Sequence, residues 1–311
     1  MDIQSSIPLA EFLRPKDIND IVGQDHLLGE GQSLKVAIDS GNLPSMILWG
    51  PPGVGKTTIA RVISNNADTQ FIALSAVLSG VKEIRESVEK AEFVSEQHNK
   101  KTILFVDEVH RFNKSQQDAF LPHIESGLII FIGATTENPS FEVNSALLSR
   151  CQTYVLKTLS ADSLTKIVDK VIDEYEKVSL DDVAKEMMLT YANGDARRLI
   201  NLLEMLINSL KPKMDGIINK ELVDKIISDK VRRFDKGGEQ FYDQISAMHK
   251  SVRGSNPDAS VYWLLRMIDG GADPLYLARR IIRISIEDIG LADPKAQTIA
   301  LEAYQIFERL G

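Results

Sequence analysis

The sequence predicts an α/β protein in which a doubly wound parallel sheet is followed by a helical lid and a C-terminal helical domain. Three observations lead to this prediction. Short apolar runs alternate with helical stretches in the first half of the chain, which is typical of a parallel sheet with helices on both faces. A glycine-rich loop separates the first apolar run from the helix after it. Beyond Lys157, apolar residues recur only at helical spacing.

The first predicted domain covers residues 1–157 and contains the sheet. Its strands are expected at the apolar runs 46–49, 71–74, 102–106 and 129–132, with a fifth at 154–156. A helix that ends near Gly41 is expected before the first strand. Further helices are expected at 58–63, 81–93 and 115–125. In such a sheet, ligands bind at the carboxyl ends of the strands.

The rest of the chain is predicted to form two helical domains, a lid at 158–229 and a C-terminal domain at 230–311. No strand-like run returns after residue 157, and Ser160 is a suitable cap for the first lid helix. In the C-terminal domain, Asn256, Asp273 and Asp293 each precede a proline, a pattern that predicts helix starts. Gly270-Gly271 and Gly290 are expected to end the preceding helices.

The glycine-rich loop has the pattern of a phosphate-binding loop, which is Gly, four residues and then Gly-Lys-Thr. Glycines let backbone N–H groups approach a phosphate, and the positive end of the following helix attracts anionic oxygen. Lys56 would supply charge at the β- and γ-phosphates, and the Thr57 hydroxyl would be a ligand of Mg²⁺. The sequence therefore predicts that ATP and Mg²⁺ bind at Gly50, Pro51, Pro52, Gly53, Val54, Gly55, Lys56, Thr57 and Thr58.

Two carboxylates follow the strand predicted at 102–106. Asp107 is expected to hold Mg²⁺ through water, and Glu108 to orient or deprotonate the water that attacks ATP. Two acids at a strand end are a weak signal alone, but their place after a phosphate loop favours this role. Thr136 ends the next strand and could bind the attacking water or the γ-phosphate. Taken alone, a polar strand end before a turn explains Thr136 more simply.

Two arginines are candidates for contact with the γ-phosphate. Arg150 is either an ordinary surface charge or an arginine finger that reaches the ATP of a neighbouring subunit. Arg197 opens a predicted lid helix, where it either contacts the phosphate and reports lid closure or is merely solvated.

Composition narrows the classes of function. The net charge of -8 and the pI of about 5.3 argue against nucleic-acid binding through bulk positive charge, although a local basic track remains compatible with them. The single cysteine, Cys151, excludes an internal disulfide and is typical of a reducing cytosol. Because no two histidines have metal-ligand spacing, we predict no zinc site. Neither a signal peptide nor a membrane span is predicted.

Five motifs occur in the order used by AAA+ ATPases: Gly50–Thr57, Asp107-Glu108, Ala134-Thr135-Thr136, Ser149-Arg150-Cys151 and Gly194-Asp195-Ala196-Arg197. The last two resemble those of clamp loaders. Longer strings at 75–86, 107–118 and 249–255 are similar to the replication-associated recombination protein A (MgsA) family, whose eukaryotic counterparts are the Werner-helicase-interacting ATPases. The resemblance covers nearly the whole chain.

The resemblance has implications for the site and for partners. It implies that Arg14, Pro15, Ile21 and Val22 flank the adenine, that Thr136 and Arg197 are the two nucleotide sensors, and that Arg150 acts in trans. It also implies a homotetramer, with a tail beyond the position of Gly311 that contributes to the tetramer contacts. The implied partners are DNA with single-stranded regions, duplex ends or forks, and single-strand-binding protein. The implied location is the cytoplasm, at the nucleoid.

Three basic clusters are candidates for DNA contact, although each is equally well explained as a solvated helix face. Lys82 and Arg85 lie one helical turn apart, in a region that clamp loaders turn toward DNA. The other clusters are Arg279, Arg280 and Arg283, and Lys230, Arg232 and Arg233.

The function predicted from these features is a DNA-dependent ATPase that acts at stalled replication forks in recombination and repair. An ATP-switched oligomeric adaptor that recruits partners is the alternative, and a clamp-loader-like subunit shares the motifs. Asp107-Glu108-Val109-His110 also has the form of a DExH helicase box. Such helicases need a second ATPase-like domain, and the sequence predicts no strands for one after residue 158.

Overall fold

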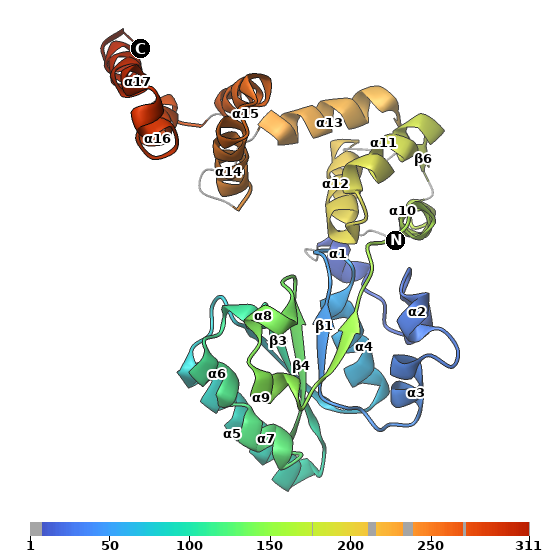
Figure 1. Cartoon of the computed structure of the whole chain (residues 1–311). Helices are drawn as coiled ribbons and strands as arrows, with labels where there is room; N and C mark the ends of the chain where they lie inside the picture. Colours follow the sequence, from blue (N-terminus) through green and yellow to red (C-terminus); the bar gives the residue numbers. More distant parts are fainter. Residues whose placement is uncertain (1–7, 176, 211–215, 233–238, 270–271, 311) are drawn as a thin grey trace. The chain divides into compact units, whose positions relative to one another are not determined.

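Five parallel strands form the central sheet of this computed structural model, in the order β2-β3-β4-β1-β5 (Figure 1). The strands are β1 (Met46–Trp49), β2 (Gln70–Ser75), β3 (Thr102–Asp107), β4 (Ile129–Thr135) and β5 (Gln152–Val155). The structure describes residues 8–175, 177–210, 216–232, 239–269 and 272–310, and it leaves out the side chains of 228–232 and 239–242. The chain forms two units, Met1–Val223 and Asp224–Gly311.

Each central strand buries side chains on both faces of the sheet, as the apolar runs predicted. Met46 and Leu48 of β1 belong to the core on one face, and Ile47 belongs to the core on the other. Helices α3 (Ser33–Asp39) and α4 (Lys56–Asn66) contribute to the first core. The second core contains residues of α5 (Val81–His98), α7 (Leu121–Glu125) and α9 (Ser145–Leu148). The predicted doubly wound parallel sheet is therefore confirmed.

Several element boundaries differ from the prediction. Strand β4 continues past Ile132 to Thr135, because Gly133, Ala134 and Thr135 pair with β1. The single helix expected at 115–125 is wrong, since the chain forms α6 (Lys114–Asp118) and then α7. Pro122 explains the break, because it has no N–H to donate to the carbonyl of Asp118. The other short helices of this part are α1 (Leu9–Phe12), η1 (Ile18–Asp20), α2 (Asp25–Leu28), η2 (Val109–Arg111) and α8 (Pro139–Glu142).

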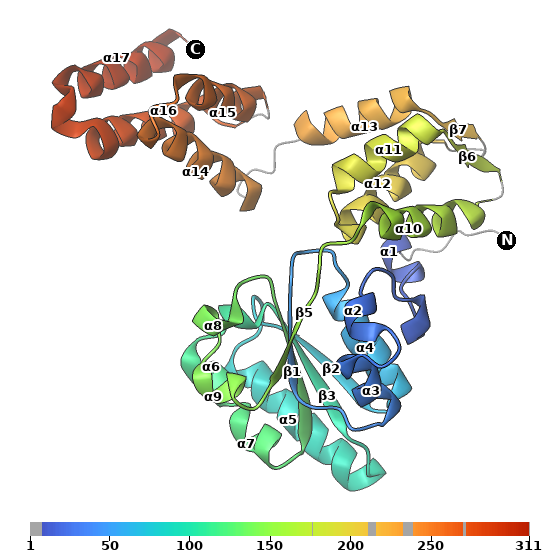
Figure 2. The ribbon, with the colours of Figure 1, turned by 45° about the vertical axis from the view of Figure 1, so that its right-hand side comes forward.

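The lid is mainly helical but contains a small parallel sheet. Its helices are α10 (Ala161–Asp173), α11 (Asp182–Ala192) and α12 (Ala196–Ser209), and they lie above the carboxyl edge of the central sheet (Figure 2). Ser160 caps α10 by accepting from the Ser163 N–H, as predicted. Strands β6 (Val178–Leu180) and β7 (Gly216–Ile218) correct the prediction that no strand follows residue 157. Runs this short carry no periodicity from which a strand can be recognised.

The second unit is helical. Its elements are most of α13 (Lys220–Arg232), α14 (Glu239–Arg253), α15 (Pro257–Asp269), α16 (Pro274–Ile284), the π-helical turn η3 (Ser285–Ile289), η4 (Gly290–Ala292) and α17 (Pro294–Leu310). The predicted caps are confirmed, because Asn256, Asp273 and Asp293 each accept a backbone N–H of the helix that follows. Gly290 ends η3 with φ +51°, whereas Gly270 and Gly271 lie outside the described residues. None of the helices within the described ranges is long and apolar enough to cross a membrane.

Candidate nucleotide-binding site

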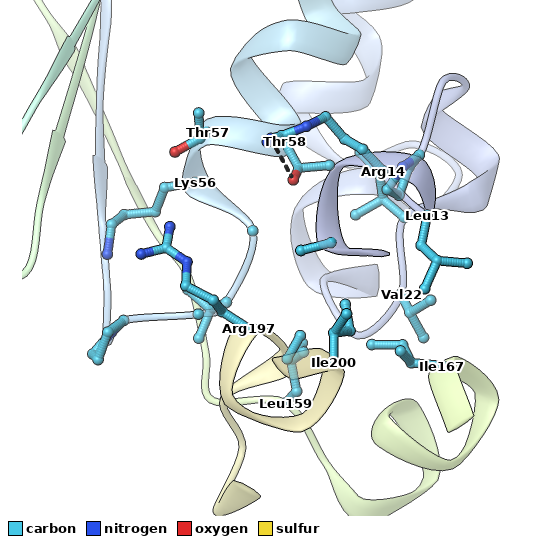
Figure 3. A pocket seen from close by; sticks show the side chains of 18 of the residues that line it. Leu13, Arg14, Val22, Lys56, Thr57, Thr58, Leu159, Ile167, Arg197 and Ile200 are labelled. Atoms are coloured by element: carbon cyan, nitrogen blue, oxygen red, sulfur yellow. Dashed lines mark hydrogen bonds between the residues drawn. The ribbon is translucent and has the colours of Figure 1, made fainter. Parts of the chain in front are cut away.

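A cavity of about 350 Å³ lies where the lid and the N-terminal segment meet the carboxyl edge of the sheet (Figure 3). One end is polar and is lined by Lys56, Thr57, Asp107, Glu108 and Arg197. The other end is apolar and is lined by side chains that include Leu13, Val22, Leu159, Ile167 and Ile200. A cavity with one charged and one apolar end suits a ligand with an anionic part and a flat hydrophobic part.

The glycines of the phosphate loop are required by the backbone. Gly53 has φ +70°, and Gly55 has φ +99° where it precedes α4, so both adopt a conformation that side chains disfavour. Gly50 packs so tightly that an added Cβ would lie 2.6 Å from the Leu156 carbonyl oxygen. The loop therefore brings its backbone, rather than side chains, to the N-terminus of α4, which is the geometry expected for an anion site.

Lys56 is a buried cation at the polar end of the cavity. Its side-chain Nζ donates to the carbonyl oxygens of Gly50 at 2.6 Å and Pro51 at 2.9 Å. Burial lowers the pKa of Lys56, while the nearby carboxylates of Glu108 and Asp107 oppose that shift. Because burial disfavours its charge, an anion bound beside Lys56 would restore the stability of the ammonium form.

Glu108 has a strained backbone conformation at the end of β3. Its φ of +54° and ψ of +46° are left-handed, which costs a residue with a side chain about 1–2 kcal/mol. Neighbouring residues on a strand point to opposite faces, and the left-handed turn lets both Asp107 and Glu108 line the cavity. Thr136 lies outside the cavity lining, but its hydroxyl donates to Oε2 of Glu108 at 3.4 Å. Strain of this kind is often found at functional sites.

The lid is joined directly to the phosphate loop. Asp195 caps α12 by accepting from the Arg198 N–H at 2.9 Å, and the Ala196 N–H donates to the Gly53 carbonyl oxygen at 3.1 Å. The next residue, Arg197, extends toward Lys56 (Figure 3), and its charge contributes to the lowered pKa of Lys56. Two cations that approach each other in this way would both be stabilised by a ligand with more than one negative charge.

The N-terminal segment borders the cavity, since Arg14, Pro15, Ile21 and Val22 all line it, and their expected contact with the adenine stays a prediction. Arg14 also forms an ion pair with Glu11 at 2.5 Å and approaches Thr58 Oγ1 at 3.5 Å. The apolar lid residues Leu159, Ile167 and Ile200 were missed by sequence reasoning. Ile167 lies in α10 and Ile200 in α12, whose apolar stripes indicated buried faces, whereas Leu159 precedes α10. None of the three carried a signal about which part of the chain it would cover.

Gln24 is a second residue that the sequence analysis missed. It is 1% exposed, and its amide binds both sides of Lys157, at the crossing from the sheet to the lid. Its Nε2 donates to the Lys157 carbonyl oxygen at 2.8 Å, and its Oε1 accepts from the Lys157 N–H at 3.1 Å. This pairing ties the segment beside Val22 to the hinge of the lid.

Arg150 is not brought to the cavity of its own chain. It follows α9, where its Nη2 lies 2.5 Å from Oε1 of Glu125 and its Nη1 donates to the Ala146 carbonyl oxygen at 2.8 Å. Its side chain is 36% exposed. Within one chain, Arg150 is thus an ion-paired surface residue.

The oxygen donors of the site suit Mg²⁺. Thr57 and Asp107 both line the polar end of the cavity. In the part of the chain that the structure describes, no group of three or more His, Cys, Asp or Glu residues could hold a metal. Mg²⁺ at phosphoryl-transfer sites characteristically takes only one or two protein oxygens and completes its shell with phosphate and water. The residues present therefore fit a Mg²⁺ that arrives with its nucleotide.

Comparison with known proteins shows which class of protein this chain belongs to. The family described as "ATPase family associated with various cellular activities (AAA)" matches residues 46–159, and the AAA C-terminal domain matches 173–253. The solved Holliday junction branch migration motor RuvB of Thermotoga maritima shares the fold, with a TM-score of 0.58 and 25% identity over 89% of this chain and 80% of that one. This is therefore an ATPase of the AAA class.

The relatives narrow the class to one family. Residues 254–311 match "MgsA AAA+ ATPase C terminal". The chain is 52% identical to replication-associated recombination protein A of Coxiella burnetii and 50% identical to that of Escherichia coli, in each case over 98% of this chain and 70% of the relative. It is also 42% identical to ATPase WRNIP1 of Dictyostelium discoideum, over 99% of this chain and 38% of that protein. The chain belongs to the replication-associated recombination protein A family.

Proposed function

We propose that this chain is a DNA-dependent ATPase that acts at stalled replication forks, in replication-associated recombination and repair. The observation that carries the proposal is the meeting of Lys56, Glu108 and Arg197 at one cavity, in a chain 52% identical to a protein named for replication-associated recombination. The cavity supports ATP binding, and the name of the relative supports the biological setting. Action at forks would place the protein at the nucleoid, in the cytoplasm.

In this proposal the phosphate loop, from Gly50 to Thr58, binds the triphosphate. Arg14, Pro15, Ile21 and Val22 border the apolar end of the cavity, where the adenine would lie. Lys56 and Arg197 bind the β- and γ-phosphates, and Thr57 and Asp107 hold Mg²⁺. Bound Mg²⁺ would neutralise charge on the phosphate oxygens. Glu108 orients the attacking water and accepts its proton, while Thr136 holds the Glu108 carboxylate.

The proposal includes a homo-oligomer, with a tetramer as the expected form. Arg150 lies away from the cavity of its own chain, and its side chain is 36% exposed to solvent. A finger in this position can stabilise the charge of a phosphoryl-transfer transition state only in a neighbouring subunit. The exposed pair with Glu125 is weak enough to be exchanged for a phosphate, since exposed ion pairs contribute about 0–1 kcal/mol.

Lys82 and Arg85 remain the first choice for DNA contact. Both are exposed on α5, and Lys82 is only loosely paired, with 3.8 Å between its Nζ and Oε1 of Glu86. The second cluster is more fully paired, because Arg279, Arg280 and Arg283 interact with Asp273, Tyr276 and Glu287 respectively. Of the third cluster, Arg233 and the side chains of Lys230 and Arg232 lie outside the described residues. Single-strand-binding protein is the proposed protein partner at the fork.

The test is the ATPase rate of the full chain without DNA and with single-stranded, duplex, gapped and forked DNA. We expect stimulation by DNA that contains gaps, ends or forks. Glu108→Gln should bind ATP but lose turnover by about 10²- to 10⁴-fold, the usual contribution of a general base. Turnover that ignores every DNA, combined with assembly that depends on ATP, would instead support an ATP-switched adaptor.

A further inference from the structure

His110 lies two residues after Glu108, in the turn η2, and the proposed mechanism does not use it. Its side chain is only 9% exposed. Its Nδ1 lies 2.9 Å from Oγ1 of Thr135 and 3.3 Å from Oε2 of Glu108. The same ring nitrogen therefore faces a fixed hydroxyl and the carboxylate to which hydrolysis is assigned.

The hydrogen bonds of Thr135 determine which group donates. Thr135 is fully buried, and its Oγ1 donates to the Glu137 carbonyl oxygen at 3.2 Å and accepts from the Glu137 N–H at 3.0 Å. A hydroxyl has one proton and two lone pairs, so one lone pair remains for His110. Nδ1 must then carry a proton, which also lets it face the carboxylate oxygen of Glu108 without repulsion between lone pairs.

We propose that His110 is a positioning residue for Glu108, with its Nδ1–H held by Thr135 so that the ring edge fixes Oε2 of the carboxylate. The inference rests on the proposed role of Glu108 in ATP hydrolysis. Thr136, the residue that follows strand β4, donates to the same oxygen, Oε2. Because the Thr136 hydroxyl and the His110 ring both lie against Oε2, Oε1 is the oxygen left to receive the proton of the attacking water.

The position of His110 explains why the left-handed turn at Glu108 matters. Val109 is fully buried and anchors η2 in the core beneath the sheet edge. The turn brings His110 back beside Glu108, where it meets Thr135 at the end of the adjacent strand β4. Glu108 is thus held through its backbone turn and through the side chains of two strand-end threonines and one histidine.

Substitutions of His110 by side chains of different length provide a matched set of variants. In His110→Asn, the amide nitrogen can take the place of Nδ1, whereas in His110→Gln it extends to the place of Nε2. His110→Leu fills similar space without a donor. We expect ATP turnover to fall about 10- to 100-fold in the Leu and Gln variants, the usual effect of a misplaced catalytic group, with ATP affinity unchanged. The Asn variant should recover most of the turnover. His98→Leu, at the exposed end of α5, is the control for losing a histidine.

A double-mutant cycle tests whether His110 acts through Glu108. In a Glu108→Gln background, measured by single-turnover hydrolysis, His110→Leu should cause no further loss, because residues that act as a unit are non-additive. Losses that multiply would overturn the inference, as would wild-type turnover by His110→Leu. Wild-type turnover by Glu108→Gln would instead contradict the role that the proposed function gives to Glu108, so the two failures are distinguishable.

A second measurement is independent of turnover. In the protein labelled with ¹⁵N-histidine, the two ring nitrogens of His110 report its tautomer, and assignment follows from the His110→Asn spectrum. We expect the proton on Nδ1. A proton on Nε2 with a bare Nδ1 would overturn the inference even if ATP turnover had fallen as expected.

Discussion

Replacing Gly53 with alanine should loosen the lid from the phosphate loop. Gly53 has φ +70°, and an added Cβ would lie 1.7 Å from Oδ1 and 2.2 Å from Cγ of Asp195. Alanine therefore has two costs, the left-handed backbone and the displacement of the Asp195 carboxylate. That carboxylate caps α12 through the Arg198 N–H, so its displacement also removes the cap of the helix that carries Arg197.

The expected loss of stability in Gly53→Ala follows from these two costs. Left-handed strain in a residue with a Cβ is about 1–2 kcal/mol, and loss of a helix cap is about 1 kcal/mol, so Gly53→Ala should reduce the free energy of unfolding by about 2–3 kcal/mol. In a unit of this size, that loss lowers Tm by roughly 5–10 °C. ATP affinity should fall with it, because the loop and the start of the lid helix both move.

The assay is denaturant unfolding of the full chain with two controls. Gly31 has a similar φ, +75°, but an added Cβ would meet nothing within 4 Å, so Gly31→Ala measures the strain alone. Asp195→Ala removes the carboxylate, so Gly53→Ala should cost about 1 kcal/mol less in that background than in the wild type. If Gly53→Ala and Gly31→Ala lose the same stability, or the two site changes are additive, the contact with Asp195 has no energetic role.

Three further predictions concern charge and assembly. Arg150→Ala should bind ATP but hardly hydrolyse it. Mixing this variant with Lys56→Ala subunits should restore ATP turnover at interfaces that the two kinds of subunit share. Mixed oligomers, seen by sedimentation, that exchange subunits without restored turnover would contradict a trans role. Changing both Lys82 and Arg85 to alanine should reduce the stimulation of ATP turnover by DNA and leave basal turnover unchanged. The slope of the logarithm of DNA affinity against the logarithm of salt concentration should flatten by roughly one unit per lost contact per subunit. An unchanged slope would mean that DNA binds elsewhere. Burial raises the pKa of Cys151 to about 12, which leaves little thiolate at pH 8. Iodoacetamide should therefore alkylate the native protein roughly 10²-fold more slowly than the unfolded chain, and mass spectrometry can measure the two rates.

The sheet and the phosphate loop could be predicted because their signals are local. A buried parallel strand needs consecutive apolar residues, and a phosphate loop needs glycines at set positions, as the positive φ values of Gly53 and Gly55 show. Strands β6 and β7 could not be predicted, since three residues carry no periodicity and their pairing joins segments far apart in sequence. The break between α6 and α7 was signalled by Pro122 and could have been predicted.

The contacts that complete the site were less predictable than its motifs. Asp107 and Glu108 were identified by their place after a strand, but the partners of Glu108 come from a later strand and from the turn that follows it. Gln24 gave no local signal, because its amide binds the backbone of Lys157, far along the chain. Motifs identify groups that react, while tertiary packing selects the groups that hold them in place.

The phosphate loop and the lid are joined firmly to each other, whereas Arg150 is held loosely. Within one chain, Ala196 donates to Gly53 and Gln24 binds both sides of Lys157, so movement of the phosphate loop reaches the lid through backbone groups and buried amides. Substitution at Lys157 or Ala196 leaves those backbone bonds in place. Arg150, in contrast, is held by an exposed pair with Glu125, and such pairs contribute about 0–1 kcal/mol. The proposed role of Arg150 as a finger in a neighbouring subunit needs such a weak tether, because phosphate in that site would have to replace Glu125 at little cost. We therefore expect nucleotide binding to set the lid within each subunit, and assembly to decide whether hydrolysis proceeds.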